Sequence, residues 1–279
     1  MAGQVAEPMM DADQEPLHEA VSACEGPDGI DEVRLLDGRV RLRQGRKGYR
    51  AGMDAALLAA ALGPAAGIRV LEAGCGAGGG LLQAAMRWPD AHFTGLERDP
   101  AALALAQENI ALNGLEGRVA TLPGDVGGGF TSLGPAEQGL APFDAAFANP
   151  PFFDDAGALR APLPERRGAW IADHGLAAWV RFLIDAVRDR GRVMIIHRAD
   201  RLGDMLAALA PRAGSVVIRP VSPFAEAPAK RVLVQAIRGG RAPLVLLPPL
   251  VLHDRSGPKH TVEADAILRG HAPLSWDQS

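Results

Sequence analysis

The feature that most constrains the fold is a regular alternation of short β-rich runs with helical runs in the middle of the chain. The β-rich runs are residues 69–72, 92–97, 119–122 and 143–148, and helical runs at 79–87 and 100–113 separate the first three. Strands that alternate with helices pair in parallel through right-handed crossovers. Because only 5% of the residues are aromatic, Ala, Val, Leu and Ile must build the core, as is typical of buried parallel strands. The sequence therefore predicts an α/β fold.

The same alternation continues toward the C-terminus. The further runs are a helix at 176–188, a strand at 193–196, a helix at 201–209 and strands at 215–219 and 232–237. The pattern thus predicts a seven-stranded, mostly parallel sheet with helices on both faces. Only a Pro-rich loop joins the last two strands, so we expect them to be antiparallel to each other. This unit spans residues 65–240.

Three segments flank the α/β unit. Residues 1–30 are rich in acidic residues and Pro without periodicity, which is the composition of a disordered acidic leader. Residues 31–64 predict a small hairpin that turns at Asp37-Gly38 and a helix with Asp54 as N-cap, a pair that could cover a substrate or cofactor. Residues 241–279 form a C-terminal extension to which the sequence assigns no role.

Charge and cysteine usage limit the classes of partner. The net charge is -4, but the first 33 residues hold nine acids and no Lys or Arg, so the rest of the chain is mildly basic and compatible with an anionic partner such as RNA. Cys24 and Cys75 form neither a disulfide framework nor a metal-ligand spacing. No apolar run approaches the roughly 18 residues of a membrane helix. We expect a cytoplasmic protein with no metal and no membrane segment, in which His92, His174 and His197 are structural.

A glycine-rich turn follows the strand at residues 69–72. Gly74, Cys75, Gly76 and Gly78 lie between this strand and the next helix, where backbone amides and the helix N-terminus can approach a ligand. The spacing also satisfies the pattern of a dinucleotide-binding turn, since Glu97 stands 21 residues after Gly76. An NAD-type oxidoreductase is therefore an open alternative at this point.

Acidic residues at the strand ends favour a different nucleoside cofactor. Glu72 stands where a pyrophosphate would gain nothing from negative charge, but where a carboxylate suits an ammonium such as that of S-adenosylmethionine. Glu97, with Arg98 beside it, ends the second strand and can accept ribose hydroxyls. Asp125, followed by Val126, comes after the third strand and can accept the amino group of an adenine. A strand-end ion pair for Glu72 and ordinary loop chemistry for Asp125 are the structural alternatives.

The most specific motif is the run Asn149-Pro150-Pro151-Phe152-Phe153 at the end of an apolar strand. Each proline restricts the residue before it and removes a backbone donor, so the Asn149 side chain and the Pro150 carbonyl are expected to face outward as acceptors. Two acceptors can take both hydrogens of a planar amine and direct its lone pair toward a methyl donor, so no strong base is needed. Phe152 can stack on a planar substrate.

These motifs together resemble the class I S-adenosylmethionine-dependent amino-methyltransferases. Within that class, residues 44–50 followed by 54–58 are similar to the bacterial enzymes that methylate N6 of an adenine in valine tRNA. The resemblance implies a Rossmann-like sheet of seven strands, S-adenosylmethionine as methyl donor, and a flipped-out adenine as acceptor. Enzymes that methylate guanine N2 in RNA or protein glutamine share the Asn-Pro-Pro-aromatic motif, so these acceptors stay open, as does a non-catalytic RNA-binding scaffold.

Two basic segments are candidate substrate contacts. The first is the acid-free stretch between Gly38 and Met53, and the second is the dipeptide after the Pro-rich loop. Both could track an RNA backbone, and an exposed hairpin face is the alternative explanation for the first. The expected substrate-binding residues are Arg46, Lys47, Tyr49, Arg50, Phe152, Phe153, Lys230 and Arg231.

Overall fold

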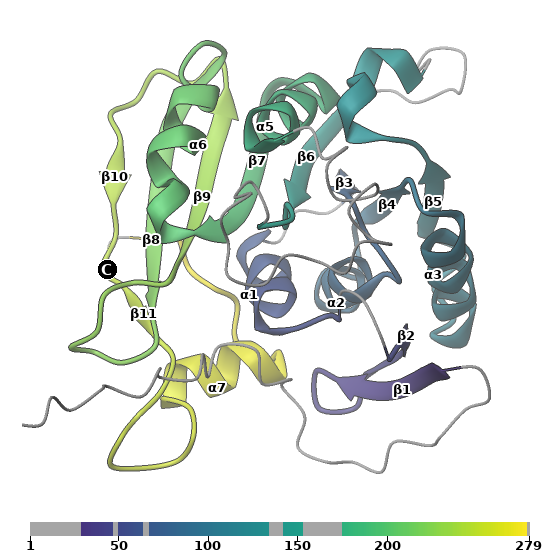
Figure 1. The fold of residues 1–279 in the computed structure, drawn as a ribbon, viewed down its shortest axis with the longest axis horizontal. Helices are drawn as coiled ribbons and strands as arrows, with labels where there is room; N and C mark the ends of the chain where they lie inside the picture. The colour runs from purple at the N-terminus through teal and green to yellow at the C-terminus, as the bar shows by residue number, and fades with distance from the viewer. Residues whose placement is uncertain (1–28, 47–49, 64–66, 134–141, 153–174, 278–279) are drawn as a thin grey trace, which may run out of the picture.

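The computed structural model describes residues 29–46, 50–63, 67–133, 142–152 and 175–277. Its main sheet has nine strands in the order β10-β8-β9-β7-β6-β3-β4-β5, with β11 also paired to β8 (Figure 1). The strands are β3 (Arg69–Ala73), β4 (His92–Glu97), β5 (Val119–Pro123), β6 (Phe143–Ala148), β7 (Val187–Arg198), β8 (Ala213–Ser222), β9 (Arg231–Arg238), β10 (Val245–Leu246) and β11 (Leu250–Val251).

The chain enters this sheet at its centre and fills it in two directions. From β3 it proceeds outward through β4 to β5, and then returns to place β6 on the other side of β3. All of these strands and β7 are parallel, whereas β9 is antiparallel to both β7 and β8, as predicted for the last pair. The seven expected strands are β3 to β9. The additional strands β10 and β11, of two residues each, come from the C-terminal extension.

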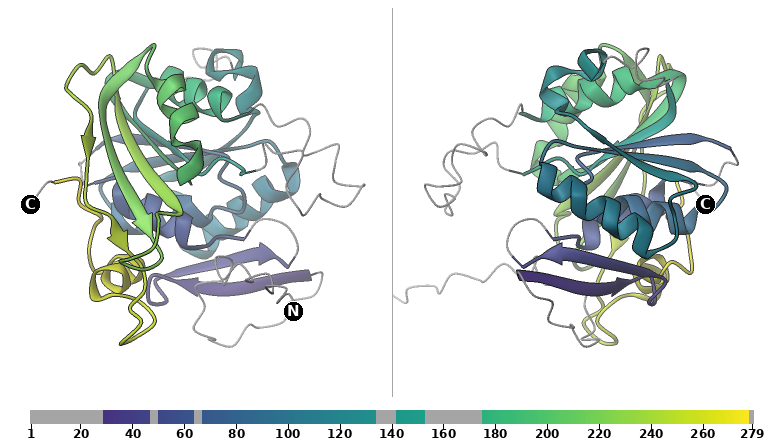
Figure 2. Two further views of the ribbon diagram at one scale, coloured as in Figure 1. Left: turned by 60° about the vertical axis from the view of Figure 1, so that its left-hand side comes forward. Right: turned by 90° about the vertical axis from the view of Figure 1, so that its right-hand side faces the viewer.

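Helices cover both faces of the sheet and bury two apolar clusters. On one face lie α1 (Met53–Ala61), α2 (Gly79–Arg87), α3 (Pro100–Leu112) and α7 (Val262–Arg269). On the other lie α5 (Gly175–Ala186), α6 (Leu202–Leu209) and the short helices η3 (Val126–Gly128) and η4 (Phe130–Leu133), while η5 (Ala199–Arg201) precedes α6. Figure 2 shows the sheet between these layers, with the N-terminal hairpin outside the first of them.

The predicted hairpin is present as β1 (Ile30–Leu35) and β2 (Val40–Gly45). Four residues connect the strands, and Leu36, Asp37 and Gly38 all have positive φ (50°, 54° and 81°), so the Asp-Gly signal marks a left-handed turn. The predicted acidic leader lies outside the described residues, except for its last two, of which Ile30 begins β1.

Two asparagines of α3 attach the hairpin to the sheet domain. Asn109 accepts a hydrogen bond from the Arg43 amide (2.8 Å) and donates to the Arg43 carbonyl (2.7 Å). Asn113 makes the same pair of bonds with the backbone of Arg41, at 2.9 and 2.7 Å. The two side chains therefore satisfy the outer edge of β2 as a neighbouring strand would.

The first turn of α1 corrects one prediction. Gly52, with φ −123° and ψ −161°, is the N-cap, and no side chain caps this helix. Asp54 lies inside the first turn, where its Oδ2 accepts from Arg231 Nε at 3.1 Å. Because Asp54 lies inside the helix and not before it, its carboxylate does not cap the first turn and instead accepts a charge-assisted bond from the guanidinium.

The C-terminal extension packs against α1 and the N-terminal hairpin. Leu274 donates its amide to the Ala60 carbonyl (3.0 Å), and Trp276 Nε1 donates to the Ala61 carbonyl (2.7 Å). Arg39 of the hairpin turn donates to the Arg269 carbonyl at the end of α7 (2.9 Å). These contacts join α1, α7 and the hairpin, so residues 241–277 are an integral part of the fold.

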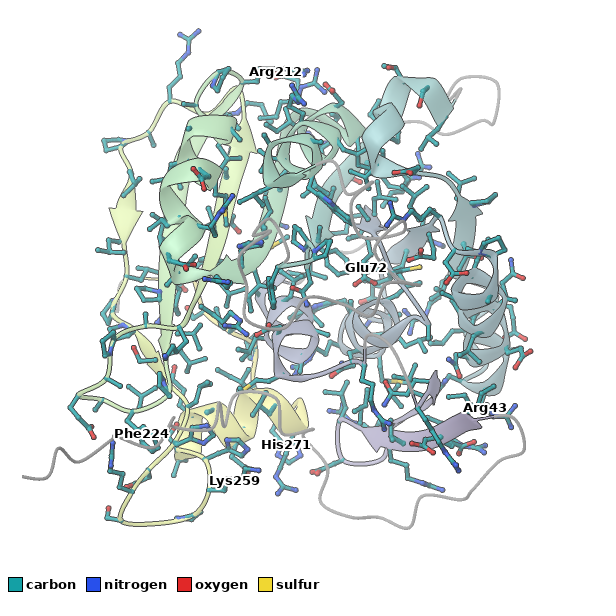
Figure 3. The ribbon with its side chains drawn as sticks, viewed as in Figure 1. Arg43, Glu72, Arg212, Phe224, Lys259 and His271 are labelled. Carbon is teal, nitrogen blue, oxygen red and sulfur yellow. The ribbon has the colours of Figure 1, made fainter. Side chains whose placement is uncertain are left out.

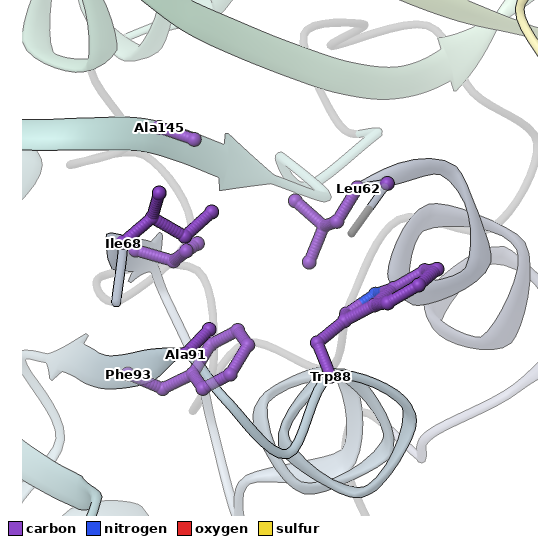
Figure 4. Close-up of a pocket in the computed structure, with 8 residues that line it drawn as sticks. Leu62, Ile68, Trp88, Ala91, Phe93 and Ala145 are labelled. Carbon is purple, nitrogen blue, oxygen red and sulfur yellow. The ribbon is translucent and has the colours of Figure 1, made fainter. Parts of the chain in front are cut away.

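A small apolar hollow lies at the amino ends of β3, β4 and β6. Six of the side chains that line it are Leu62, Ile68, Trp88, Ala91, Phe93 and Ala145 (Figure 4). Its lining offers no titratable group, and it lies at the opposite edge of the sheet from the polar strand ends. None of the helices in the described ranges has the length and apolar character needed to cross a membrane.

Candidate active site

The predicted cofactor residues meet at one edge of the sheet. Glu72 lies in β3 near its carboxyl end, Glu97 ends β4, Asp125 follows β5 and Asn149 follows β6. The order in which strands are added to the sheet reverses between β3 and β6, and ligands of open α/β sheets bind outside the carboxyl ends of the strands at such a switch point. The arrangement therefore forms a candidate active site.

The glycine turn begins with a close approach between backbone and an aromatic ring. The amides of Gly74 and Cys75 both donate to the Leu96 carbonyl, at 2.8 and 2.9 Å. Gly74 has φ +70°, and a Cβ atom there would lie 2.6 Å from Trp179 of α5. Cys75 is buried, and this burial raises the pKa of its thiol, so it serves as packing and not as a reactive group.

The second half of the turn presents Glu97 to a ligand. Gly76 donates its amide to Glu97 Oε2 (2.9 Å), while the amides of Arg98 and Asp99 donate to Oε1 (2.8 and 2.9 Å). These bonds fix the carboxylate in one orientation at the end of β4. Gly78, with φ +92°, is the left-handed N-cap of α2. The turn thus orients the Glu97 carboxylate at this edge, whereas the amides of its glycines, which the sequence suggested for a ligand, donate to groups within the protein.

Glu72 is the most unusual group of the site. Only 5% of it is exposed, and a Cβ atom on Gly80 would lie 2.3 Å from its Oε1, so α2 packs directly on the carboxylate. Burial, with a smaller contribution from Glu97, raises the pKa of Glu72 well above its ordinary value, and a hydrogen bond from the Leu81 amide opposes this shift. Figure 3 shows Glu72 near the centre of the view, over α2.

One oxygen of Glu72 is available for a donor. Its Oε2 is buried and accepts no hydrogen bond among the residues that the structure describes. A buried carboxylate oxygen without a partner is costly, and a cationic donor would remove that cost. The residues present therefore fit a ligand with an ammonium beside the glycine turn, and among the described residues Glu72 forms no ion pair with an arginine, which was the structural alternative.

Asp125 and Arg98 lie together at the ends of β5 and β4. Asp125 Oδ1 accepts from the Gly127 amide (2.9 Å) as the N-cap of η3, and its Oδ2 lies 3.8 Å from an Arg98 guanidinium nitrogen. Both side chains are nearly half exposed, so they can turn to a ligand. Val126 is buried in the apolar cluster with Phe130, so only its backbone could meet a cofactor.

The proline motif leaves the sheet at β6. Asn149 and Pro150 follow β6 directly, and Pro150 is buried while Pro151 is exposed. The Phe152 ring meets His197 of β7 edge to face, with centroids 5.1 Å apart and planes at 87°. This contact places His197 beside the motif, a position that spacing along the chain could not indicate. Phe153 lies outside the described residues.

The predicted basic segment is paired within the hairpin. Arg46 and Arg50 bind the two oxygens of Asp31, at 2.8 and 2.9 Å. Arg41 and Arg43 likewise bind Glu32, and the hydrogen bonds to these arginines lower the pKa values of both acids. Because Asp31 and Glu32 neutralise these arginines, the hairpin offers less unpaired positive charge than the basic run alone suggests. Figure 3 shows Arg43 at the margin of the hairpin. Lys47 and Tyr49 lie outside the described residues.

The two residues of the second basic segment, Lys230 and Arg231, lie in different environments. Lys230 is exposed in the loop between β8 and β9. Arg231 turns inward instead, where it binds Asp54 and lies over the Phe152 ring, 4.7 Å from the centroid. Lys230 thus remains available to a substrate, whereas Arg231 belongs to the interior of the site. Among the described residues, no group of His, Cys, Asp and Glu side chains is placed to hold a metal ion.

The central part of the chain matches a known protein family. Residues 64–166 match the family described as "Methyltransferase domain". This segment is thus similar to methyltransferase domains. The matched range contains β3 to β6, the glycine turn, every predicted cofactor residue and the Asn-Pro-Pro-Phe motif. The match agrees with the predicted methyltransferase class and with S-adenosylmethionine as its cofactor, and it gives no support to the oxidoreductase alternative.

Curated relatives extend the likeness over part of the chain. The tRNA1(Val) (adenine(37)-N6)-methyltransferases of two Porphyromonas gingivalis strains are 33% and 31% identical to it over 164 residues. The matched part is 56% of this chain and 61% of each relative. The chain thus spans less than two thirds of the length of these relatives.

A solved structure covers more of the methyltransferase fold. The crystal structure of protein Atu636 from Agrobacterium tumefaciens, described as a predicted O-methyltransferase, aligns with a TM-score of 0.66 and 26% identity. The alignment covers 79% of this chain and 98% of that chain. The likeness therefore extends beyond the 103 residues of the matched domain to most of the sheet and its helices.

Proposed function

We propose that the protein transfers a methyl group from S-adenosylmethionine to an exocyclic amine of an RNA base, with adenine N6 in a tRNA as the first candidate. The observation that carries this proposal is the position of Asn149 and Pro150. They follow β6 at the switch point, beside the glycine turn and the buried Glu72 of β3. A tRNA substrate places the enzyme in the cytoplasm.

The residues that would hold the cofactor differ in chemistry along the sheet edge. Glu72 accepts the ammonium, the backbone of Gly74 and Gly76 lies along the methionine end, Glu97 accepts the ribose hydroxyls, and Asp125 accepts the adenine amino group. S-adenosylmethionine, when bound, supplies an electrophilic methyl group at this site.

The acceptor side needs no general base. Asn149 Oδ1 and the Pro150 carbonyl accept the two hydrogens of the amine, which keeps the nitrogen lone pair out of conjugation with the ring and directed at the methyl group. Such preorganised acceptors contribute about 10²–10³ each in rate. Phe152 supplies a ring on which the extruded base can stack, a contact that is worth about 1–3 kcal/mol.

The support for an RNA base comes from the curated relatives, which act on an adenine of tRNA according to their names. The mildly basic balance of the chain after residue 33 agrees with an RNA substrate. Guanine N2 and protein glutamine present a similar planar amine, so they are the alternative acceptors.

The test is methyl transfer from labelled S-adenosylmethionine into bulk RNA from a strain that lacks this protein, followed by nucleoside analysis. We expect label in N6-methyladenosine of the tRNA fraction. The Asn149→Ala variant should lose turnover by about 10²–10³ while its cofactor affinity stays near that of the wild type. Label in N2-methylguanosine would change the base, and label only in protein would refute the RNA assignment.

A further inference from the structure

We infer that Asp54 and Arg231 form a positioning pair that holds the Phe152 ring, and with it the Asn149-Pro150 acceptors, in place. This inference rests on the proposed function, because it concerns the same site. It gives Arg231 a role different from the direct substrate contact that its place in a basic dipeptide predicts.

The contacts around Arg231 leave it little freedom. Its Nε donates to Asp54 Oδ2 (3.1 Å), a second guanidinium nitrogen donates to the Lys230 carbonyl (3.3 Å), and the group lies 4.7 Å from the centroid of Phe152. His197 meets the same ring edge to face. Phe152 is therefore held by a cation on β9 and an aromatic group on β7, and both contacts constrain its position.

The Asp54–Arg231 ion pair is less exposed to solvent than an ion pair at the surface. The exposed fractions are 21% for the Arg231 side chain and 17% for Asp54, whereas Arg198, which pairs with Arg231 in the β7–β9 register, is 40% exposed and binds Asp200. Exposed pairs contribute little, but breaking a mostly buried pair leaves an uncompensated charge. The energetic coupling between Asp54 and Arg231 should thus be large enough to measure.

The pair also joins three parts of the fold that are distant in sequence. Asp54 belongs to the first turn of α1, Arg231 begins β9, and Phe152 ends the motif after β6. Because Arg231 lies over one face of the ring, a substrate base must stack on the opposite face. The carboxylate of the N-terminal helix thereby sets which face of Phe152 the substrate can use.

The experiment compares Asp54→Asn, Arg231→Met and the double variant with the wild type in tRNA methylation, cofactor binding and tRNA binding. We expect each single change to lower kcat about tenfold, because a desolvated cation–π contact is worth about that factor. Cofactor affinity should stay unchanged, and the double variant should be no slower than Arg231→Met. Arg198→Met is the matched control, since it removes a cation from the same strand pair without touching Phe152.

The two roles of Arg231 predict opposite effects of Asp54→Asn. If Arg231 positions Phe152, both single variants lower kcat. If Arg231 instead binds a phosphate, Asp54→Asn frees it and tightens tRNA binding, while Arg231→Met weakens tRNA binding. That pattern of opposite signs would overturn the inference.

Hydrogen exchange gives a readout that does not depend on the substrate. The amides of Asn149 and Phe152 should exchange faster in both single variants than in the wild type and in Arg198→Met. Unchanged exchange there would overturn the positioning role even if activity falls. Faster exchange in an enzyme that methylates no RNA would uphold the positioning pair and refute only the proposed function.

Discussion

Replacing Glu72 by Gln removes a buried carboxyl group and preserves the shape of the side chain. In the wild-type protein this carboxylate is 5% exposed and packs against Gly80, and its Oε2 has no hydrogen-bond partner among the described residues. The substitution therefore has two opposite consequences. It removes the proposed acceptor for the cofactor ammonium, and it relieves the cofactor-free protein of a carboxyl group that burial makes costly to ionise.

The expected size follows from these contacts. A hydrogen bond between charged groups is worth about 1.5–3 kcal/mol, so the dissociation constant for S-adenosylmethionine should rise about 10- to 100-fold. The stability of the cofactor-free protein should increase at neutral pH, because burial opposes the ionisation of Glu72 that the unfolded chain allows, whereas Gln has no such difference between the two states. Titration calorimetry measures the first effect, and thermal unfolding without cofactor measures the second.

The pH dependence of stability has a definite sign. Burial raises the pKa of Glu72 in the folded protein well above the ordinary 4.5. Below pH 4.5 the group is protonated in both the folded and unfolded states and has no effect. As the pH rises from 4.5 through the raised value, the unfolded state releases its proton first and the folded protein loses stability. The gain from Glu72→Gln should therefore grow across that window and level off above it.

Cofactor binding should show the complementary dependence. An ammonium prefers the carboxylate form of Glu72, so wild-type affinity should increase with pH across the same window, and the affinity of Glu72→Gln should not. Glu72→Gln with wild-type affinity at all pH values would refute the assignment of Glu72 to the ammonium. A fall in stability at neutral pH would refute the claim that its burial is costly.

Three further substitutions test other parts of the structure. Asn109→Ala should lower the free energy of unfolding by about 3 kcal/mol in urea titrations, because the backbone of Arg43 loses both of its partners; a loss near zero would mean that the hairpin is not docked. Gly74→Ala should weaken cofactor binding in calorimetry and cost about 1–3 kcal/mol of stability, since the residue has φ +70° and its Cβ would lie 2.6 Å from Trp179. Trp276→Phe should cost about 1 kcal/mol in thermal unfolding through the lost bond to the end of α1; an unchanged transition would argue against closure by the C-terminal segment.

The parts of the fold that local sequence determines were predicted. The strand–helix alternation gave β3 to β9, the Asp37-Gly38 signal gave the hairpin, and the short Pro-rich loop gave the antiparallel pair β8 and β9. The strand-end positions of Glu72 and Glu97 followed from the same alternation, because parallel strands place their carboxyl ends at one edge. In each of these cases the controlling interactions are between neighbours in the sequence or are imposed by sheet geometry.

Contacts between distant segments were not predicted, because no local signal encodes them. Asp54 was expected to be an N-cap, but its partner Arg231 lies 177 residues away. His197 was expected to be only structural, and its approach to Phe152 depends on the adjacency of β6 and β7. Trp276 donates its hydrogen bond to a backbone carbonyl, a group that every residue has, so no side chain in the sequence marks the partner.

The ion pairs of the hairpin arginines were not predicted, although the local sequence contains the signal for them. The register places Glu32 opposite Arg43, and cross-strand pairs of opposite charge stabilise antiparallel ladders. Counting outward from the Asp-Gly turn would have indicated this pair. The basic stretch alone therefore overstated the charge that the hairpin offers to RNA, and Lys230 is a better-placed cation at the edge of the site.

The two acceptors of the proposed site also favour an amine over a hydroxyl. An NH2 group supplies two hydrogens, one each for Asn149 Oδ1 and the Pro150 carbonyl, whereas a hydroxyl supplies one and leaves an acceptor unsatisfied. An unsatisfied buried acceptor costs about 1–3 kcal/mol, which corresponds to about 10- to 100-fold in rate. The Agrobacterium tumefaciens neighbour is described as a predicted O-methyltransferase, so the ratio of N- to O-methylation is informative. Nucleoside analysis should show N-methylated bases in excess over 2′-O-methylated ribose by at least that factor, and the reverse ratio would refute the two-acceptor argument.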